Sequence, residues 1–334
     1  MTRRPRWLCS AIARLDYGLL LPLLSRLPPW AAGWFIRLRG VVNYAFDLEW
    51  RTLALGHGYV REATLLAMRA ICSLTHSPRS PHLLTLRRFV TSSWEEYDAQ
   101  RLARIDYAGL PWHGCGMDKV LQAVRSGRGV VLLTGHFDSL YVGLMVLARQ
   151  GVRVNLMSSR IVEDPRAPKE IRAHFANKIA VMAKHFHPGK VMHFEDGLKP
   201  FADALKRGEI VVVACDGPAT AGNRGTVVRF LGANYEMAAG PEFFARKAAA
   251  LVSMYTCVRE ADGRFRLDFS EPAACEDGGM QLAFDRLDER IRAEPWRWWA
   301  ADLYRGYATA KTEPAVRGNV PDAVEPSSVA APHL

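Results

Sequence analysis

The sequence has no paired cysteines. Its six cysteines are scattered over 334 residues, with no Cys-x-x-Cys pair and no spacing typical of a zinc site or a disulfide framework. A chain of this length can bury a large core without disulfides or metals. The cysteine pattern therefore favours a reducing location that faces the cytosol.

Common motifs of nucleotide binding and serine hydrolysis are also missing. The chain contains no P-loop and no Gly-x-Gly-x-x-Gly fingerprint, which removes the usual nucleotide-binding interpretations. It has no Gly-x-Ser-x-Gly elbow, so a serine nucleophile of the α/β-hydrolase type is not expected. Cys215 beside Asp216 suggests a thiol nucleophile, but the preceding residues IVVVA favour a buried cysteine at the end of a strand.

No unbroken apolar run is long enough to predict a membrane-spanning helix. Residues 16–40, DYGLLLPLLSRLPPWAAGWFIRLRG, are interrupted by Arg26 and by Pro28 and Pro29, whereas a spanning helix needs about 20 apolar residues in a row. The leucines, tryptophans and flanking arginines are typical of an anchor that lies in the headgroup layer of an anionic cytoplasmic leaflet. The alternative is a buried amphipathic helical hairpin that contacts no membrane.

Lysine is scarce, because 35 of the 44 basic residues are arginine, against 34 acidic residues. Guanidinium groups pair well with phosphates and carboxylates, so anionic lipid headgroups, nucleic acid and an acidic carrier protein all fit this charge. Genome base composition is an alternative source of the excess. Trp296, Trp298 and Trp299 lie beside Arg297 but in no nucleic-acid recognition fold. We therefore expect core packing or a membrane-facing edge there, and no nucleic-acid partner.

The periodicity of apolar residues changes near residue 129. Before it, residues 61–74 have helical spacing, and Ser92 with Glu95 forms a capping signal for a helix start. After it, short β-rich runs alternate with helical stretches, which predicts an α/β fold with a mixed central sheet flanked by helices. The expected strands lie within residues 129–134, 152–159, 209–217, 226–232, 250–258 and 265–269, and the expected helices within 168–183, 198–208, 240–250 and from 280 onward.

These patterns divide the chain into three regions. Residues 1–125 are expected to form an amphipathic anchor and a helical preface, and residues 126–307 the α/β core. The tail, residues 308–334, has four prolines, no aromatic residue and little periodicity, so we expect it to be disordered and assign it no function.

His136 is the first candidate catalytic residue. It follows the apolar run VVLL in the stretch TGHFDSLYVG, where a buried strand should end and a helix begin. Open α/β sheets place reactive groups at this edge, and the first turn of the next helix can supply N–H groups that stabilise an anion. A structural histidine is the alternative.

A second candidate site surrounds Asp216. EIVVVACDGPATAGNRGTVVRFLG reads as a strand that ends at Asp216, a loop with Arg224, and a short strand that ends at Arg229 and Gly232. An acid at a strand end followed by arginines suits a polar or anionic group of a substrate. Arg160, after the strand at 152–159, is a further candidate. The alternative is a turn capped by Asp216 with solvated arginines.

The order of these segments resembles that of the lauroyl and myristoyl acyltransferases of bacterial lipid A biosynthesis, within the lysophospholipid-acyltransferase-like superfamily. The segments are GVVLLTGHFDSLYVG, then KRGEIVVVACDGPATAGNRGTVVRFLGANYEMAAGPEFFARKAAALVSMYTCVR, and RIRAEPWRWWAADLYRGY. The resemblance covers about residues 10–307.

The resemblance implies a function and roles for the site. His136 corresponds to the general base of the family, which takes a proton from an acceptor hydroxyl that attacks the thioester of acyl carrier protein or coenzyme A. Asp216 matches the acid of the second motif, and Arg229 to Gly232 match the element after it. The acceptor is a lipid A precursor or another glycolipid, and the transfer needs no metal, cofactor or acyl-enzyme. The expected location is the cytoplasmic face of the inner membrane.

One position departs from the family pattern of His, four residues, then Glu or Asp. The position of that acid, one helical turn beyond the histidine, is Tyr141. Either Asp138 takes over as the carboxylate that orients His136, or Tyr141 orients it by a hydrogen bond. In a third interpretation the protein binds a lipid or acyl chain without transferring it.

The three histidines of KHFHPGKVMHFED, with Glu195 and Asp196, form the only cluster that resembles a metal site. Their spacing fits no zinc motif, so we expect solvated side chains and no metal.

Overall fold

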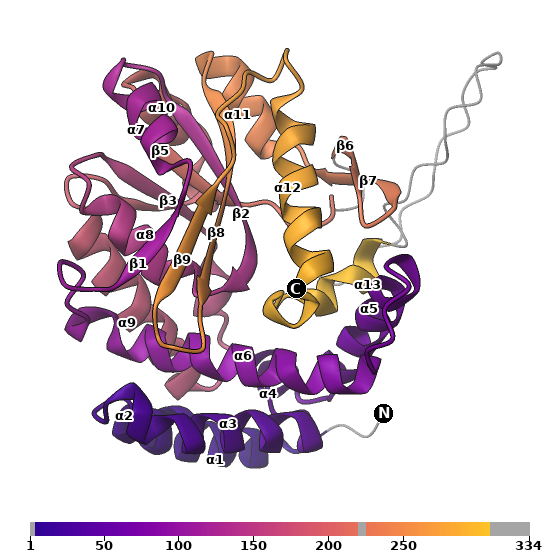
Figure 1. Cartoon of the computed structure of the whole chain (residues 1–334). Helices are drawn as coiled ribbons and strands as arrows, with labels where there is room; N and C mark the ends of the chain where they lie inside the picture. Colours follow the sequence, from indigo (N-terminus) through magenta and orange to yellow (C-terminus); the bar gives the residue numbers. More distant parts are fainter. Residues whose placement is uncertain (1–3, 220–224, 308–334) are drawn as a thin grey trace, which may run out of the picture.

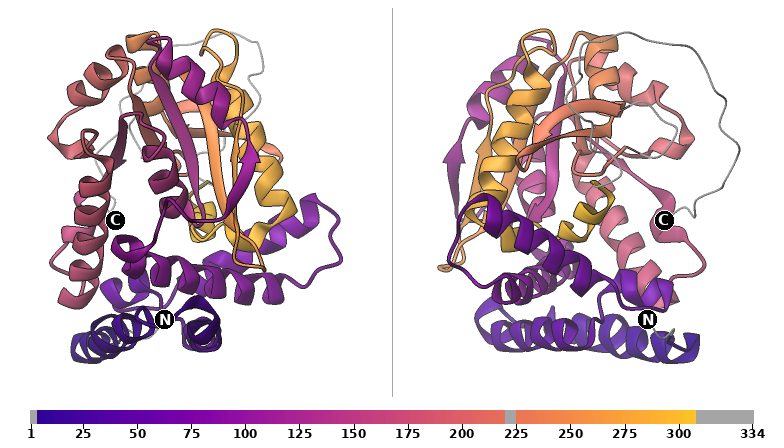
Figure 2. Two further views of the ribbon diagram at one scale, coloured as in Figure 1. Left: turned by 60° about the vertical axis from the view of Figure 1, so that its left-hand side comes forward. Right: turned by 90° about the vertical axis from the view of Figure 1, so that its right-hand side faces the viewer.

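The N-terminal helices form a layer of their own. The computed structural model describes residues 4–219 and 225–307. Helix α1 (Arg6–Leu15), a π-helical segment (Asp16–Leu20) and α2 (Leu21–Leu24) are continuous, and α3 (Pro29–Phe46) runs back beside them. Pro28 and Pro29 separate the two runs because proline fits the first turn of a helix but not its interior. The layer lies below α6 in both views of Figure 2.

The outer side of this layer is apolar, and we call it the apolar face. Large apolar side chains that are exposed together on one surface mark an interaction site. Among the described residues, the helical run Arg6–Leu24 is long and apolar enough to cross a membrane by length and composition. The exposed large apolar residues of the face are Trp7, Leu15, Leu19, Leu20, Leu23, Leu27, Trp30, Trp34, Phe35, Leu38, Val41, Val42 and Phe46.

Three further helices, α4 (Trp50–Leu55), α5 (Val60–Leu74) and α6 (Pro81–Arg101), separate the N-terminal layer from the sheet (Figure 1). Helix α5 confirms the helix expected at 61–74. The helix start expected at Ser92 is wrong, because α6 begins at Pro81 and both Ser92 and Glu95 are buried in its interior. A Ser-x-x-Glu spacing caps a helix only where the backbone N–H groups lack partners.

Buried ion pairs fix α6 to the N-terminal layer. The Arg39 guanidinium of α3 pairs with Asp16 at 2.6 Å and with Glu96 of α6 at 2.5 Å. The Tyr17 hydroxyl donates a hydrogen bond of 2.5 Å to Glu96. A buried charge is tolerated only with such partners, so the apolar face holds one position relative to the rest of the molecule.

The central sheet has seven strands in the order β1-β9-β8-β2-β5-β3-β4. Strands β8 and β9 are antiparallel, and the other neighbouring pairs are parallel, which confirms the expected mixed sheet flanked by helices. Strand β1 precedes residue 126, so the sheet starts before the expected boundary of the α/β core. The strands are β1 (Trp112–Cys115), β2 (Val130–Asp138), β3 (Val154–Ser158), β4 (Val191–His193), β5 (Ile210–Ala214), β8 (Leu251–Arg259) and β9 (Phe265–Phe269).

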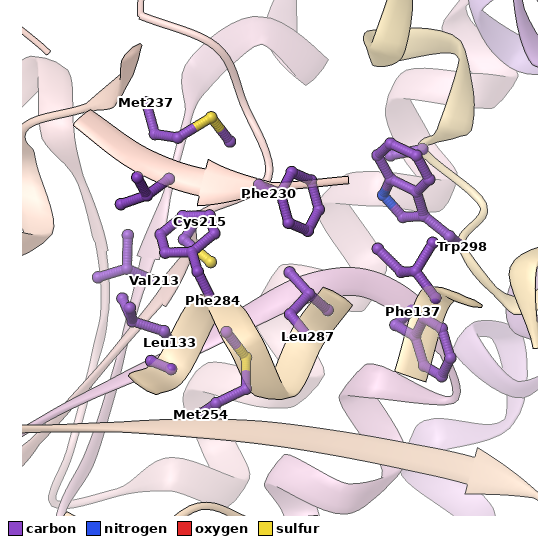
Figure 3. Packing of buried hydrophobic residues seen from close by; sticks show 14 of the residues in the cluster. Leu133, Phe137, Val213, Cys215, Phe230, Met237, Met254, Phe284, Leu287 and Trp298 are labelled. Atoms are coloured by element: carbon purple, nitrogen blue, oxygen red, sulfur yellow. The ribbon is translucent and has the colours of Figure 1, made fainter. Parts of the chain in front are cut away.

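Both faces of the sheet are buried. In β2, Val131 and Leu133 belong to one apolar cluster, and Val130 and Leu132 belong to another. Successive side chains of a strand point to opposite faces, so continuous apolar runs such as VVLL require cover on both. Helices α7 (Met117–Arg125), α8 (Leu140–Ala148) and α9 (Lys169–Phe186) cover one face, and α10 (Lys199–Lys206), α11 (Gly240–Ala248) and α12 (Gly279–Ala293) the other. Figure 3 shows Phe284 and Leu287 of α12 in the cluster that contains Leu133.

A separate hairpin of β6 (Gly225–Phe230) and β7 (Ala233–Ala238) packs beside α12. The two residues of its turn, Leu231 and Gly232, have positive φ values of 46° and 83°. Two such residues are the mark of a type I′ turn, which joins twisted strands. A Cβ atom at Gly232 would also lie 2.7 Å from Cδ1 of Leu74. Gly232 therefore shapes the hairpin. The last described helix is α13 (Tyr304–Tyr307), and residues 308–334 lie outside the described residues.

Candidate active site

His136 lies where β2 departs from regular pairing. Strand β2 pairs with β8, and the register shifts between Thr134 and Asp138. Gly135 allows the chain to pass α12 closely, because a Cβ atom there would meet Cδ1 of Leu287 at 2.9 Å. The irregular segment turns His136 away from the ladder, and its side chain remains 28% exposed. The histidine is thus held by a strand but accessible to a ligand.

The partner of the His136 imidazole is Asp216, which follows β5. Nδ1 of His136 lies 2.6 Å from Oδ1 of Asp216, and the His136 backbone N–H donates to Oδ2 at 2.8 Å. An ionised carboxylate can only accept, so Nδ1 carries the hydrogen of this bond and Nε2 has the free lone pair. This is the tautomer that a general base needs.

Asp216 is fully buried and surrounded by donors. The indole Nε1 of Trp298 donates to Oδ2 at 2.8 Å, and the Tyr307 hydroxyl donates to the Asp216 backbone carbonyl at 2.7 Å. Burial raises the pKa of this carboxyl, but the charge and hydrogen bonds of His136 and the bond from Trp298 outweigh it, so the pKa is lowered. Asp216 is therefore ionised and can stabilise a protonated imidazole.

The tryptophan-rich segment after α12 closes around the histidine. The Trp299 backbone N–H donates to the His136 carbonyl at 2.9 Å, and Phe137 forms an isolated bridge with Trp298. The Trp299 ring stands edge-on to the imidazole, with centroids 4.7 Å apart. Trp298 and Trp299 are buried, which confirms the expected core packing, and they also hold His136 in place.

Asp138 does not orient His136, contrary to one expectation from the sequence. Its carboxylate accepts hydrogen bonds from Ser139, at 2.8 Å, and from the Arg297 guanidinium. Its backbone has a positive φ of 42°, which directs the side chain toward Arg297. Asp138 is therefore a buried partner of Arg297, and Asp216 takes the orienting role.

Tyr141 does not orient His136 either, because Nδ1 is already bonded to Asp216. Tyr141 is in the first turn of α8, and the Lys178 ammonium of α9 lies 4.2 Å from the centre of its ring. Lys178 pairs with Glu95 of α6 at 3.3 Å, and both side chains are buried. Burial lowers the pKa of Lys178, but the charge and hydrogen bond of Glu95, with the charges of Tyr141 and Glu96, together outweigh it, so the pKa is raised. The tyrosine thus faces a paired ammonium group.

A cavity of about 290 Å³ opens beside His136, and we call it the His136 cavity. It lies at the carboxyl ends of β2, β5 and β3, represented by Thr134, Ala214 and Ser158, where α/β sheets place their sites. Glu95, Tyr141 and Lys178 line it, with apolar side chains making up most of the remaining wall: Trp50, Leu140, Leu156, Met157, Phe175, Ile179, Met182, Phe194, Val213 and Trp299. The cavity suits an apolar ligand with one polar group near the imidazole.

Of the other residues expected to bind substrate, those that the structure describes, Arg160, Asp216, Arg229 and Gly232, do not line this cavity. Arg160 is an exposed residue whose guanidinium donates to Asp196 at 2.8 Å. Arg229 is exposed on β6 and lies 3.6 Å from Asp285. Gly232 forms the turn of the same hairpin, and Arg224 lies outside the described residues. Asp216 is fully buried, and its carboxylate contacts His136 and Trp298 instead of the cavity.

The surroundings of Cys215 do not favour a thiol nucleophile. Burial raises the pKa of the Cys215 thiol well above its ordinary value, and the charge of Asp216 adds to the rise, so Cys215 stays an unreactive thiol. Within residues 4–219 and 225–307, no three His, Cys, Asp or Glu side chains are grouped so that they could hold a metal ion.

Comparison with known proteins identifies the family. The family described as bacterial lipid A biosynthesis acyltransferase matches residues 95–301, which is more than half of the chain and includes His136, Asp216 and Trp298. A search of the curated proteins finds no match. The helical run of the apolar face agrees with a membrane-associated member. The match covers more than half of the chain, and the His136–Asp216 pair lies beside the apolar His136 cavity. The chain therefore belongs to the bacterial lipid A biosynthesis acyltransferase family.

Proposed function

We propose that the protein transfers a fatty acyl chain from the thioester of acyl carrier protein or coenzyme A to a hydroxyl of a lipid A-type or other glycolipid, with His136 as general base. The observation that carries this proposal is the 2.6 Å bond between His136 and the buried Asp216 beside an apolar cavity. Neither group acts alone, because the carboxylate sets the tautomer that leaves Nε2 able to accept a proton.

In the proposed step, Nε2 of His136 removes the proton of the acceptor hydroxyl while that oxygen attacks the thioester carbon. The tetrahedral intermediate then breaks its carbon–sulfur bond, and the thiolate takes the proton from the imidazolium. Asp216 stabilises the imidazolium between these events. Atoms and charges balance with donor and acceptor alone.

The first turn of α8 is the proposed site for the negative oxygen of the intermediate. Leu140 and Tyr141 begin this helix and line the His136 cavity. The first N–H groups of a helix have no acceptor within the helix, and the helix dipole favours an anion there.

We place the protein at the cytoplasmic face of the inner membrane, bound through its apolar face. Trp30 and Trp34 are 83% and 77% exposed on that face, and tryptophan favours the headgroup layer. The free cysteines among the described residues fit a reducing compartment. Because α6 contacts both α3 and the His136 cavity, a lipid acceptor would have a short path from the bilayer.

The activity can be tested with the full-length protein in detergent. The protein is incubated with radiolabelled acyl carrier protein or acyl coenzyme A and a total membrane lipid extract. We expect label to move into lipid from at least one donor. If lipid binds but no label moves from either donor, the protein is an acyl- or lipid-binding member that has lost the transfer reaction.

Two substitutions separate orientation from structure. Tyr141→Phe is expected to change kcat by less than about threefold, because Tyr141 does not bond the imidazole. Asp138→Asn is expected to lower the free energy of unfolding by about 2 kcal/mol, because Arg297 loses a charged partner, with kcat nearly unchanged. Initial rates and urea unfolding measure both effects. A hundredfold loss of kcat in either variant without a loss of stability would return the orienting role to that residue.

A further inference from the structure

A second hollow lies outside the proposed active site, and we call it the α3–α6 groove. It has a volume of about 780 Å³ and shares no lining residue with the His136 cavity. Its walls come from α3, α6, the turn after β8 and the tryptophan-rich segment, and they include Trp30, Trp34, Arg37, Arg87, Trp296 and Arg297. Neither the family assignment nor the proposed transfer step accounts for it.

Positive charge in the groove is only partly compensated. Arg297 pairs with Asp138, whereas the guanidinium groups of Arg37 and Arg87 form no ion pair or hydrogen bond with any residue in the described part of the chain. The Arg87 guanidinium lies 3.5 Å from the centre of the Trp296 ring, and the Arg79 guanidinium lies 5.2 Å from the same ring. Burial lowers the pKa of Arg87, the charges of Arg297 and Arg79 lower it further, and the charge of Glu294 offsets only part of this. A bound anion would relieve this repulsion.

The carboxylates of the groove do not neutralise these arginines, since each has another partner. Asp138 is bound by Arg297, and Asp262 lies 2.7 Å from Arg264. Glu260 lies 3.6 Å from His113. The uncompensated guanidinium groups therefore come from the two adjacent helices α3 and α6, and a phosphate group offers them several acceptor oxygens.

The groove also adjoins the apolar face. Trp30 and Trp34 line the groove and belong to that face, where they are among its most exposed side chains. A ligand in the groove would therefore have its charged group among arginines and its apolar part at the level of the bilayer. A soluble acidic protein would have to approach from the side that the bilayer occupies. We propose that the α3–α6 groove binds the phosphate headgroup of an anionic glycerophospholipid, separately from the acyl acceptor.

This inference rests on the membrane association proposed above but not on acyl transfer. A lipid held in the groove would fix the depth and rotation of the protein in the headgroup layer, because α6 joins the groove to the His136 cavity. The experiment measures binding of the full-length protein to vesicles by sedimentation. It compares vesicles of phosphatidylcholine alone with vesicles that also contain phosphatidylglycerol. The groove variant carries Arg37→Gln and Arg87→Gln.

The control variant carries Arg125→Gln and Arg128→Gln, which remove the same charge from exposed positions at the end of the molecule that lies farthest from α3 in Figure 1. We expect the groove variant to bind phosphatidylglycerol vesicles roughly 10- to 30-fold more weakly than wild type, and the control variant to stay within about twofold. Binding to pure phosphatidylcholine and acyl transfer in detergent should not change in either variant.

Four results would overturn the proposal. Equal weakening in the two variants would mean that the vesicles respond to net charge, and no weakening in the groove variant would mean that the groove holds no lipid. Loss of binding to acyl carrier protein in the groove variant, with vesicle binding intact, would make it a carrier site. If wild type binds no vesicles, the groove proposal and the proposed membrane association are both wrong. The acyl-transfer assay still tests the proposed reaction separately. Trp30→Ser with Trp34→Ser should weaken binding to both vesicle types, which tests the membrane association separately from the preference for phosphatidylglycerol.

Discussion

Replacing Asp216 with asparagine is expected to lower kcat by on the order of 10⁴-fold, because it imposes the wrong tautomer on His136. The asparagine carbonyl can accept the bonds that the His136 N–H and the Trp298 indole now make to Oδ2. Its NH₂ group then faces Nδ1, which must accept, and the proton moves to Nε2. KM should change little, since Asp216 is fully buried and touches no substrate.

The measurement is steady-state acyl transfer over a range of pH, with urea unfolding of the same preparations. Asp138→Asn is the matched control, because it removes a buried carboxylate two residues from His136 that does not contact the imidazole. A folded Asp216→Asn protein with kcat within tenfold of wild type would show that the carboxylate does not set the tautomer.

The second large effect concerns stability. Arg88→Met is expected to lower the free energy of unfolding by about 3–5 kcal/mol, since it removes one partner of a buried ion pair. The Arg88 side chain is fully buried in α6, bonds Glu49 at 3.0 Å and donates to the carbonyl of Trp299. Without it, Glu49 keeps only Arg51, and Trp299, which packs against His136, loses a hydrogen bond to α6.

Urea unfolding measures this loss, and Arg69→Met is the control because Arg69 is an exposed arginine on the neighbouring helix α5. The Arg88 variant should also transfer acyl chains more slowly, through the displaced Trp299. Arg51 and Arg88 also share a second buried acid, Asp302. A destabilisation below about 1 kcal/mol would mean that the Arg51 guanidinium alone is sufficient to pair with both Glu49 and Asp302.

Local pattern was enough to place His136 at the edge of the sheet. The run VVLL predicts a buried strand, and β2 extends from it to His136 and Asp138. The strand expected at 209–217 likewise ends just before Asp216. Parallel neighbours bring their carboxyl ends to one edge of a sheet, so the two residues could be expected near each other once β2 and β5 were known to pair.

The contacts that define the site are long-range, and no local pattern encodes them. Asp216 lies 80 residues from His136 along the chain, and Trp298 lies 82 residues beyond Asp216. Local sequence therefore indicates only Asp138 and Tyr141 as groups that could orient His136, because both are near it in the chain. Glu95 was interpreted as a helix cap, because its pairing with Lys178 depends on how α6 and α9 pack. The expected strands do not include β1, β4 and β7. Strands β1 and β4 have only four and three residues, and β7 has no β-branched residue, although its apolar and polar residues alternate.

The central claim is that His136 accepts the proton of the acceptor hydroxyl. The most direct measurement is single-turnover transfer of a radiolabelled acyl chain from carrier to lipid by wild type and His136→Ala, with acyl-chain binding measured in parallel. We expect wild type to label lipid and His136→Ala to bind the donor equally well but to produce no label above background. Transfer by His136→Ala within tenfold of wild type would contradict the claim.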